Sequence, residues 1–179
     1  QHSLKLPYLE WLHSKLSSGF EVYPIRPKKG YKQHYFITKP NKTFGLLRLK
    51  FYPKGKKKIP SDIESLLKYP ISLAVWYMDD GNLAHNNDQE DRANFATCGF
   101  DEASLNSLGQ AFLRLGIVAT KYCSGGYWRI RLNSSEAEKL FVLIAPYIPI
   151  VMQYKLPEYF RLGSNIYTPS KIRYKPEIT

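Results

Sequence analysis

The sequence predicts an α+β fold, in which an αββαββα unit is preceded by a partial copy of the same unit. From residue 70 onward, helical and strand periodicities alternate in the order helix, two strands, helix, two strands, helix. Gly125 and Gly126 mark a hairpin between the last two strands, because glycine tolerates the positive φ of tight turns. We expect a partial, strongly basic half-unit over 1–68, a complete unit over 69–160 and a C-terminal tail over 161–179.

The first part of the chain is predicted to hold one helix and then short strands. Leucines spaced along residues 6–16 give a helical stripe, and prolines and glycines break residues 20–52 into strands. Apolar and polar residues alternate cleanly in the last of these strands, residues 47–52. Its apolar members, expected to face a core, are Leu47, Leu49 and Phe51. A brief helix follows, with Ser61 as N-cap and Glu64 completing a capping box.

The complete unit is easier to divide into elements. Pro70 suits the first residue of a helix, and Asp101 suits the cap of another. On the last strand, Trp128, Ile130 and Leu132 point one way, and Tyr127, Arg129 and Arg131 point the other. The predicted elements are helices at 70–79, 102–115 and 134–147, and strands at 94–100, 117–123 and 127–132.

The charge is distributed unevenly along the chain. Residues 1–68 contain fifteen Lys and Arg against four Asp and Glu, whereas residues 69–179 contain eleven of each. A one-sided cationic excess is typical of a phosphate-binding surface. The alternative is a solvated, lysine-rich face without a partner.

Several classes of protein and site are excluded. No apolar run is long enough to span a membrane, and no signal peptide is visible. Cys98 and Cys123 form neither a disulfide framework nor a zinc site, so both are expected to be small buried residues in a reducing compartment. The four histidines have no metal-ligand spacing.

The segment 73–81 carries two adjacent carboxylates, Asp79 and Asp80, at the end of a predicted helix. The last carbonyls of a helix already present partial negative charge, so this position disfavours acidic residues. A divalent cation would relieve the repulsion, and oxygen ligands suit Mg²⁺. The alternative is a solvated Asp-Asp-Gly turn.

The same segment resembles the LAGLIDADG motif, in a divergent form that ends Met-Asp-Asp-Gly. Two flanking segments, 57–60 and 153–157, also resemble one branch of the LAGLIDADG homing endonucleases. The resemblance covers roughly residues 45–160. It implies the LAGLIDADG homing endonuclease fold, with a DNA-binding saddle of β-strands, and a site-specific double-stranded DNA endonuclease that uses Mg²⁺ or another divalent cation.

The resemblance also implies roles for particular residues. Asp80 would be the metal-binding catalytic carboxylate, and Asp79 would contribute a second metal contact, through its backbone carbonyl. Lys57 and Lys155 match basic residues near the scissile phosphates. Alternatively, Lys155 caps the helix before it or lies in solvent, and Lys57 only attracts phosphate.

Polar side chains on the predicted strands would contact the DNA, since Arg and Asn can pair with guanine and adenine. The alternative is an exposed polar face without a partner. The residues predicted to bind DNA are Lys32, His34, Arg48, Lys50, Tyr52, Lys54, Arg92, Asn94, Lys121, Tyr127, Arg129 and Arg131.

Only one motif helix is visible, whereas two are needed for double-strand cleavage. We expect the second to come from a missing first-motif segment or, as the alternative, from a second copy of the chain. Two other functions remain open: an intron RNA maturase, and a non-cleaving DNA-binding regulator on the same scaffold. Proteins of this type are intracellular and encoded in introns of organelles, phages and microbes.

Overall fold

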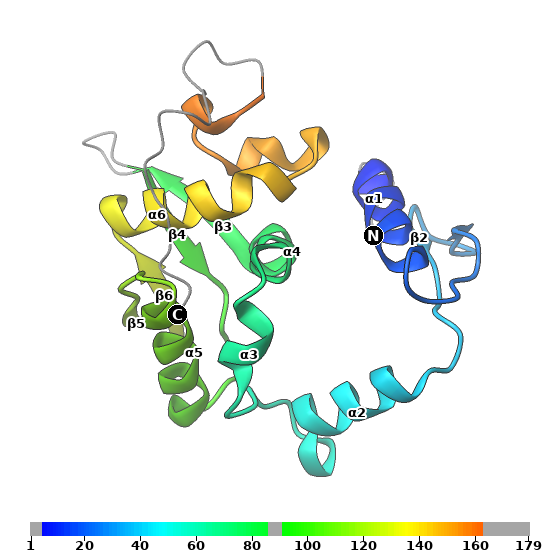
Figure 1. Ribbon diagram of the computed structural model, residues 1–179, viewed down its shortest axis with the longest axis horizontal. Helices are drawn as coiled ribbons and strands as arrows, with labels where there is room; N and C mark the ends of the chain where they lie inside the picture. The colour runs from blue at the N-terminus through cyan, green and yellow to red at the C-terminus, as the bar shows by residue number, and fades with distance from the viewer. Residues whose placement is uncertain (1–4, 86–90, 163–179) are drawn as a thin grey trace. The chain divides into compact units, whose positions relative to one another are not determined.

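The computed structural model describes residues 5–85 and 91–162, and the chain divides into two compact units, 1–49 and 50–179. The elements are labelled along the chain in Figure 1. The predicted boundary at 68/69 falls inside the second unit, because helix α3 (Ile63–Leu67) packs on later helices of that unit. The predicted tail lies outside the described residues, except for Arg161 and Leu162.

The first unit contains two helices and a small antiparallel ribbon. Helix α1 follows the predicted leucine stripe closely, so the first predicted helix is confirmed. The ribbon strands pair through Arg26 with Tyr35 and Pro27 with His34. The elements are α1 (Leu6–Ser17), β1 (Arg26–Pro27), β2 (His34–Tyr35) and α2 (Lys42–Phe51).

The prediction of a strand over residues 47–52 is wrong, because helix α2 covers all but the last of them. The Oδ1 atom of Asn41 accepts a hydrogen bond from the backbone N–H of Thr43 at 2.8 Å, which caps the start of α2. Leu, Arg and Lys, which fill the segment, are also good helix formers. None of the α2 residues is buried, and Leu49 is 69% exposed rather than facing a core.

The second unit has the predicted αββαββα order from α4 to α6. Its four strands form one antiparallel sheet in the order β3-β4-β6-β5. None of the described helices is both long and apolar enough to cross a membrane. Besides α3, the elements are η2 (Pro53–Gly55), α4 (Pro70–Asp80), β3 (Gly81–His85), β4 (Asp91–Phe95), α5 (Glu102–Arg114), β5 (Thr120–Ser124), β6 (Tyr127–Leu132), α6 (Ser134–Ile144), η3 (Ala145–Tyr147), η4 (Ile150–Lys155) and η5 (Glu158–Phe160).

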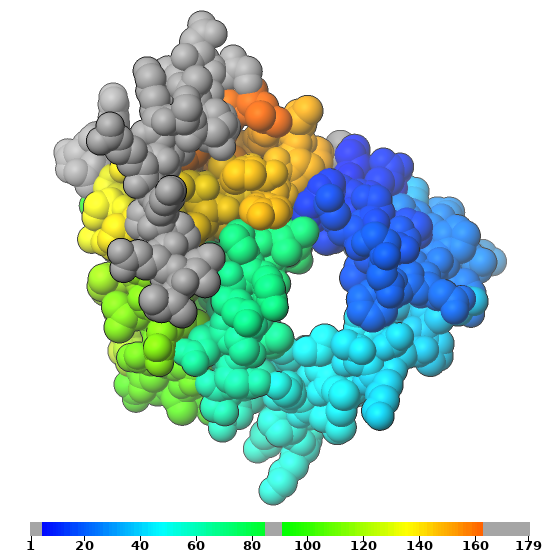
Figure 2. Space-filling model, viewed as in Figure 1, coloured from blue at the N-terminus to red at the C-terminus, as the bar shows by residue number. Residues whose placement is uncertain are grey.

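The core of the second unit lies between one face of the sheet and helices α4, α5 and α6. Phe95 of β4 is fully buried, and its ring centroid lies 4.4 Å from that of Trp76 and 5.4 Å from that of Phe112. Tyr77 and Phe141 join α4 to α6 edge to face, and α4 lies against the yellow C-terminal helices in Figure 2. Burial of each such ring contributes about 1.5–3 kcal/mol, so this face of the sheet is fixed against the helices.

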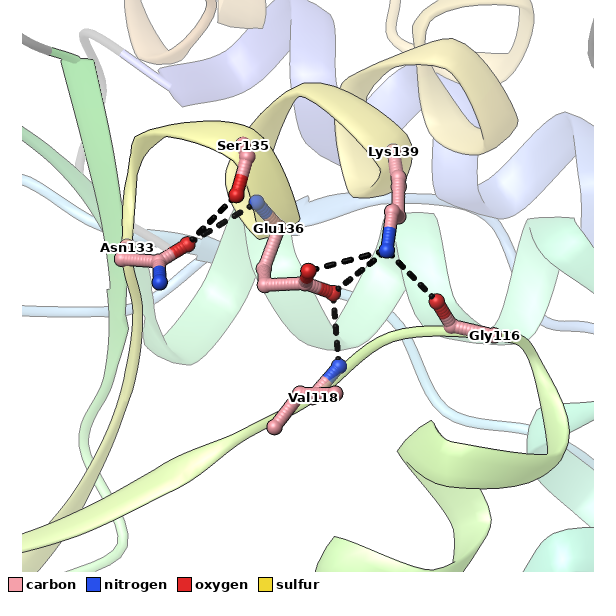
Figure 3. A network of polar contacts seen from close by, with 6 residues as sticks. All are labelled: Gly116, Val118, Asn133, Ser135, Glu136 and Lys139. Atoms are coloured by element: carbon pink, nitrogen blue, oxygen red, sulfur yellow. Dashed lines mark hydrogen bonds and ion pairs between the residues drawn. The ribbon is translucent and has the colours of Figure 1, made fainter.

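A polar network joins the start of α6 to the segment that follows α5 (Figure 3). The carboxylate of Glu136 accepts hydrogen bonds from the backbone N–H of Val118 at 2.7 Å and from Lys139 Nζ at 2.8 Å, while Asn133 caps α6. Desolvation disfavours the ionised form of Glu136, but these hydrogen bonds outweigh it and hold the pKa of Glu136 below its usual value. The ionised carboxylate therefore fixes the entry to β5.

Several boundaries differ from the prediction. The predicted capping box at Ser61 is wrong, because α3 begins at Ile63. The residue directly before α3 is Asp62, whose side chain forms an ion pair with Lys50 and does not cap the helix. Strand β4 ends at Phe95 rather than at the predicted residue 100, and the next backbone N–H, that of Ala96, donates a hydrogen bond to the Asp80 carbonyl. The Asp101 cap is confirmed: its Oδ1 accepts a hydrogen bond from Ser104 N at 2.8 Å.

The prediction that both cysteines are buried is also wrong. Cys98 and Cys123 are both exposed and not disulfide-bonded. Cys123 lies on β5, which is an edge strand of the sheet. Cys98 lies in the turn after β4, where no strand pairing covers it.

Candidate functional site

The carboxylate pair of the motif stands at the last two positions of helix α4. Asp79 and Asp80 are both exposed, and Gly81 follows directly as the first residue of β3. The Asp80 carbonyl accepts a hydrogen bond from the backbone N–H of Ala96 at 2.9 Å. That bond ties the end of α4 to the end of β4, so the backbone that carries the carboxylates is held by the sheet.

Gly81 is required by space rather than by a positive φ. Its φ of −85° is open to any residue, but a Cβ atom there would lie 2.2 Å from Cδ2 and 2.6 Å from the carbonyl oxygen of Tyr77. Tyr77 is fully buried and cannot move aside. The glycine after the carboxylates therefore lets the chain leave the helix directly against the Tyr77 ring.

Lys155 caps the C-terminal end of α4. Its ammonium donates hydrogen bonds to the carbonyls of Met78 at 2.5 Å and Gly81 at 2.7 Å, with a longer contact to Tyr77 O at 3.4 Å. The positive charge offsets the partial negative charge of the helix end. The alternatives from the sequence were that Lys155 lies in solvent or caps the helix before it. In the structure, its ammonium caps the motif helix.

Tyr77 fixes the backbone of Lys155 in return. The Tyr77 hydroxyl donates a hydrogen bond to the Lys155 carbonyl at 2.8 Å. Burial, with a smaller contribution from the charge of Asp91, raises the pKa of Tyr77 well above its usual value, so the hydroxyl stays a neutral donor. The resemblance named Lys155 but not Tyr77, and only the contact between distant segments reveals the tyrosine.

Lys57, the other predicted catalytic lysine, is exposed in the segment after η2. Its ammonium lies 4.5 Å from the centroid of the Phe100 ring, a cation–π contact. That contact joins the segment before α3 to the turn before α5. It gives Lys57 a local role, whereas Lys155 contacts the motif helix itself.

The chemistry of the carboxylate pair suits a magnesium ion. Mg²⁺ prefers hard oxygen ligands and is usually held by one or two carboxylates, with water and substrate phosphate completing its shell. Asp79 and Asp80 supply that donor type at an exposed helix end. Within residues 5–85 and 91–162, no group of three or more acidic, Cys or His side chains could hold a metal.

The strand register places five of the predicted DNA contacts on the sheet face opposite the core, which we call the arginine face. Ala93, Phe95, Ile130 and Leu132 are buried against the helices, so their strand neighbours point the other way. Arg92, Asn94, Arg129 and Arg131 are such neighbours, and Tyr127 shares their face because it lies two residues from Arg129 on β6. The prediction of their common orientation is confirmed, and their contact with DNA stays a prediction.

Lys121 does not share this face. It pairs with buried Ile130 in the register, and its ammonium reaches α5, 3.2 Å from Glu102 Oε1 and 2.8 Å from Asn106 Oδ1. Strand β5 is at the edge of the sheet, so a long side chain can extend past the edge to a helix. The placement of Lys121 on the arginine face was therefore wrong.

Four polar residues were missed on the arginine face. Directly opposed residues share a face, and the residues opposite Asn94, Arg131, Arg129 and Tyr127 in the register are Asn82, Thr120, Tyr122 and Ser124. The alternation of Thr120 and Tyr122 with Lys121 could have revealed two of them. Because Lys121 is charged, the sequence interpretation assigned Lys121, rather than Thr120 and Tyr122, to this face.

The predicted contacts in the basic segment lie on different elements from those expected. Arg48 and Lys50 are on helix α2, and Lys50 is ion-paired with Asp62. The rest of the set comprises Lys32, exposed in the turn between β1 and β2, half-buried His34 on β2, Tyr52 at the end of α2, and Lys54 in η2. None lies on the four-stranded sheet.

The chain matches a family model and several known proteins. The model described as the LAGLIDADG DNA endonuclease family matches residues 1–140. A cytochrome b mRNA maturase, bI2, from Debaryomyces hansenii is 31% identical over 122 residues, 65% of this chain and 43% of that protein. A probable intron-encoded DNA endonuclease 3 from Mycosarcoma maydis is 29% identical over 132 residues, 70% of this chain and 94% of that protein.

A solved structure shares the fold. The homing endonuclease I-WcaI, bound to its DNA recognition sequence, aligns with a TM-score of 0.63 and 22% identity over 83% of this chain and 71% of its own. The chain spans less than half the length of the maturase that it matches. The family model covers well over half of the chain, and the fold agrees with it. The chain belongs to the LAGLIDADG DNA endonuclease family.

Proposed function

We propose that this chain acts as a site-specific double-stranded DNA endonuclease, a homing endonuclease that hydrolyses phosphodiester bonds with Mg²⁺ or another divalent cation. The observation that carries the proposal is the position of the carboxylates relative to the sheet. Asp80 ends α4 two residues before Asn82, the first member of a polar row, Asn82–Asn94–Arg131–Thr120, that crosses all four strands. The proposed DNA-binding surface and the proposed metal-binding end of α4 are therefore adjacent within one unit.

The charge of the arginine face supports a nucleic-acid partner. Arg92, Arg129 and Arg131 point away from the helices, and the described strand residues on that face include no acidic side chain. Arginine side chains bind phosphates and base edges, and a sheet can enter the major groove. The name of the I-WcaI structure, which is bound to its DNA recognition sequence, supports the same partner.

Each residue has a proposed part in the reaction. Asp80, with Asp79, would hold the metal, which when bound would activate a water and stabilise the leaving oxygen. Lys155, whose ammonium donates to the carbonyls of Met78 and Gly81, would position Asp80 rather than contact the phosphate. Lys57 would attract the DNA backbone. One described helix carries the motif, so a second copy of the chain or a further segment would supply the other cleavage centre.

The test uses a duplex selected by the protein itself. Duplexes that bind the wild-type chain are enriched from a randomised pool, and the best is placed in a plasmid and incubated with Mg²⁺. We expect cleavage that EDTA abolishes. Asp80→Asn is expected to bind the plasmid site with near wild-type affinity and not to cut it, because the carboxylate holds metal rather than DNA. Failure of the wild type to cut, or loss of binding in Asp80→Asn, would contradict these roles.

A second candidate function is an intron RNA maturase. The observation that favours it is the Debaryomyces hansenii relative, which carries the name of a maturase. The arginine face would serve RNA phosphates as well as DNA phosphates, so salt-dependent affinity for both must be compared. Tighter binding to structured intron RNA than to any selected duplex would favour the maturase.

A further inference from the structure

Arg131 is held by two neighbours on the arginine face. It pairs with Asn94 across β6 and β4, the two central strands, and its Nε donates a hydrogen bond to Asn94 Oδ1 at 3.2 Å. Its guanidinium carbon lies 4.2 Å from the centroid of the Tyr122 ring. Free arginine side chains sample many rotamers, and these two contacts restrict that freedom. The guanidinium is therefore oriented before any ligand binds.

The contacts leave the outer end of the guanidinium available. Arginine has five N–H donors, and Asn94 takes one, so four remain on the two terminal nitrogens. Within residues 5–85 and 91–162, the side chain of Arg131 makes no other hydrogen bond or ion pair. The remaining donors form a planar fork, which matches two acceptors side by side. In the major groove, guanine presents such a pair at O6 and N7.

The position of Arg131 favours a base over a phosphate. It lies on a central strand, flanked by Asn94 on one side and Thr120 on the other. When a sheet lies in a groove, its middle is nearest the base edges and its rims are nearest the backbone. Arg131 is also only half exposed, which suits a short, directed contact.

Asn94 has a different role from the one that its residue type predicts. An Asn that reads adenine needs both its carbonyl and its amide group for the base. In this structure the carbonyl oxygen of Asn94 already accepts from Arg131. Building on the proposed DNA-binding function, we infer that Arg131 reads a guanine in the DNA site, and that Asn94 and Tyr122 position its guanidinium.

The first experiment compares base preferences. Duplexes from a pool with a randomised central segment are selected on wild-type protein and on Arg131→Lys, and the bound sequences are counted. The lysine keeps the charge but loses the fork. We expect the variant to lose a guanine preference at a single position, by roughly 5- to 150-fold. Arg129→Lys, the matched control, is expected to change a different position.

The second experiment separates positioning from reading. Asn94→Ala is expected to lower the same guanine preference about 2- to 12-fold, and Tyr122→Leu about 2- to 5-fold. Neither should alter preference at another position, and neither should act further in the Arg131→Lys background. Asn94→Ser is expected to recover part of the preference, since a hydroxyl can also accept from Arg131 Nε.

Three outcomes would overturn the inference. A guanine preference retained in Arg131→Lys would remove Arg131 as its reader. Loss of an adenine preference in Asn94→Ala, with the guanine intact, would make Asn94 the reader. If the wild type selects a sequence and either of these results follows, the inference is wrong and the proposed function is unaffected. If the wild type enriches no duplex at all, the proposed function fails and the inference with it.

Discussion

Lys155→Met removes a positive charge from the end of α4 while keeping a side chain of similar length. The wild-type ammonium donates to the carbonyls of Met78 and Gly81 and contacts a third, that of Tyr77. These carbonyls belong to the last turn of the motif helix and the residue after it, where few intrahelical donors are available. In the variant the same carbonyls face a methyl group, which cannot donate a hydrogen bond.

The expected loss follows from these contacts. A hydrogen bond to a charged group contributes about 1.5–3 kcal/mol when buried, and a cation at a helix C-terminus adds about 0.3–1 kcal/mol. Lys155 is half-buried, so solvent screens part of both contributions. We expect a decrease of about 2–3 kcal/mol in the free energy of unfolding, which lowers the unfolding temperature by roughly 4–12 °C for a chain of this size.

Urea unfolding followed by circular dichroism measures the change, with cleavage of the selected plasmid assayed in parallel. Lys57→Met is the matched control: it removes a lysine of the same proposed site whose ammonium lies over the Phe100 ring, so it should cost less than about 1 kcal/mol. Cleavage by Lys155→Met is expected to fall because Asp80 loses its fixed position. If cleavage is lost while stability stays at the wild-type level, Lys155 acts on the reacting groups and the capping argument is wrong.

Three further perturbations test the same unit. Gly81→Ala places a methyl group 2.2 Å from the Tyr77 ring, so it should destabilise the protein by about 2–4 kcal/mol in thermal or urea unfolding, and wild-type stability would contradict the packing. Glu136→Gln should cost about 1–2 kcal/mol at neutral pH. Because folding lowers the pKa of Glu136, the wild-type contribution is present above about pH 4.3 and is lost as the pH falls through the folded-state pKa, so the two proteins should converge in acid. Removal of divalent cations with EDTA should stop cleavage without lowering the unfolding temperature, and a lower temperature would show that the metal also holds the fold.

Local signals explain why the second unit was predictable. Pro70 begins α4, Asp101 caps α5, and Gly125 and Gly126 take φ values of 60° and 78° in the hairpin turn. Each of these residues acts within a few positions of itself, so a single sequence suffices to recognise it. The alternation on β6 was equally local, and the structure confirms that Ile130 is buried while Arg129 and Arg131 point away from the core.

Residues 47–52 show where local patterns mislead. A stretch of alternating Leu and basic residues is compatible with a strand, but it also consists of good helix formers. The choice depended on the Asn41 cap, six residues upstream, and on the absence of burial along α2. Lys121 misled for a related reason: its charge suggested the solvent face, whereas its partners Glu102 and Asn106 lie on a helix fifteen or more residues away.

The sequence predicted that a cation compensates the negative charge at the end of α4, but it suggested a metal ion and not a lysine. Asp79 and Asp80 stand where a helix disfavours negative charge, which suggested that a cation must compensate. The structure supplies one in Lys155, from a segment more than seventy residues later. A positive charge at this helix end is therefore supplied within the chain itself, by the Lys155 ammonium at the carbonyls of Met78 and Gly81. That separates the two roles a cation could have: stabilising the helix end is assigned to Lys155, and binding at the exposed Asp80 is assigned to the proposed catalytic metal.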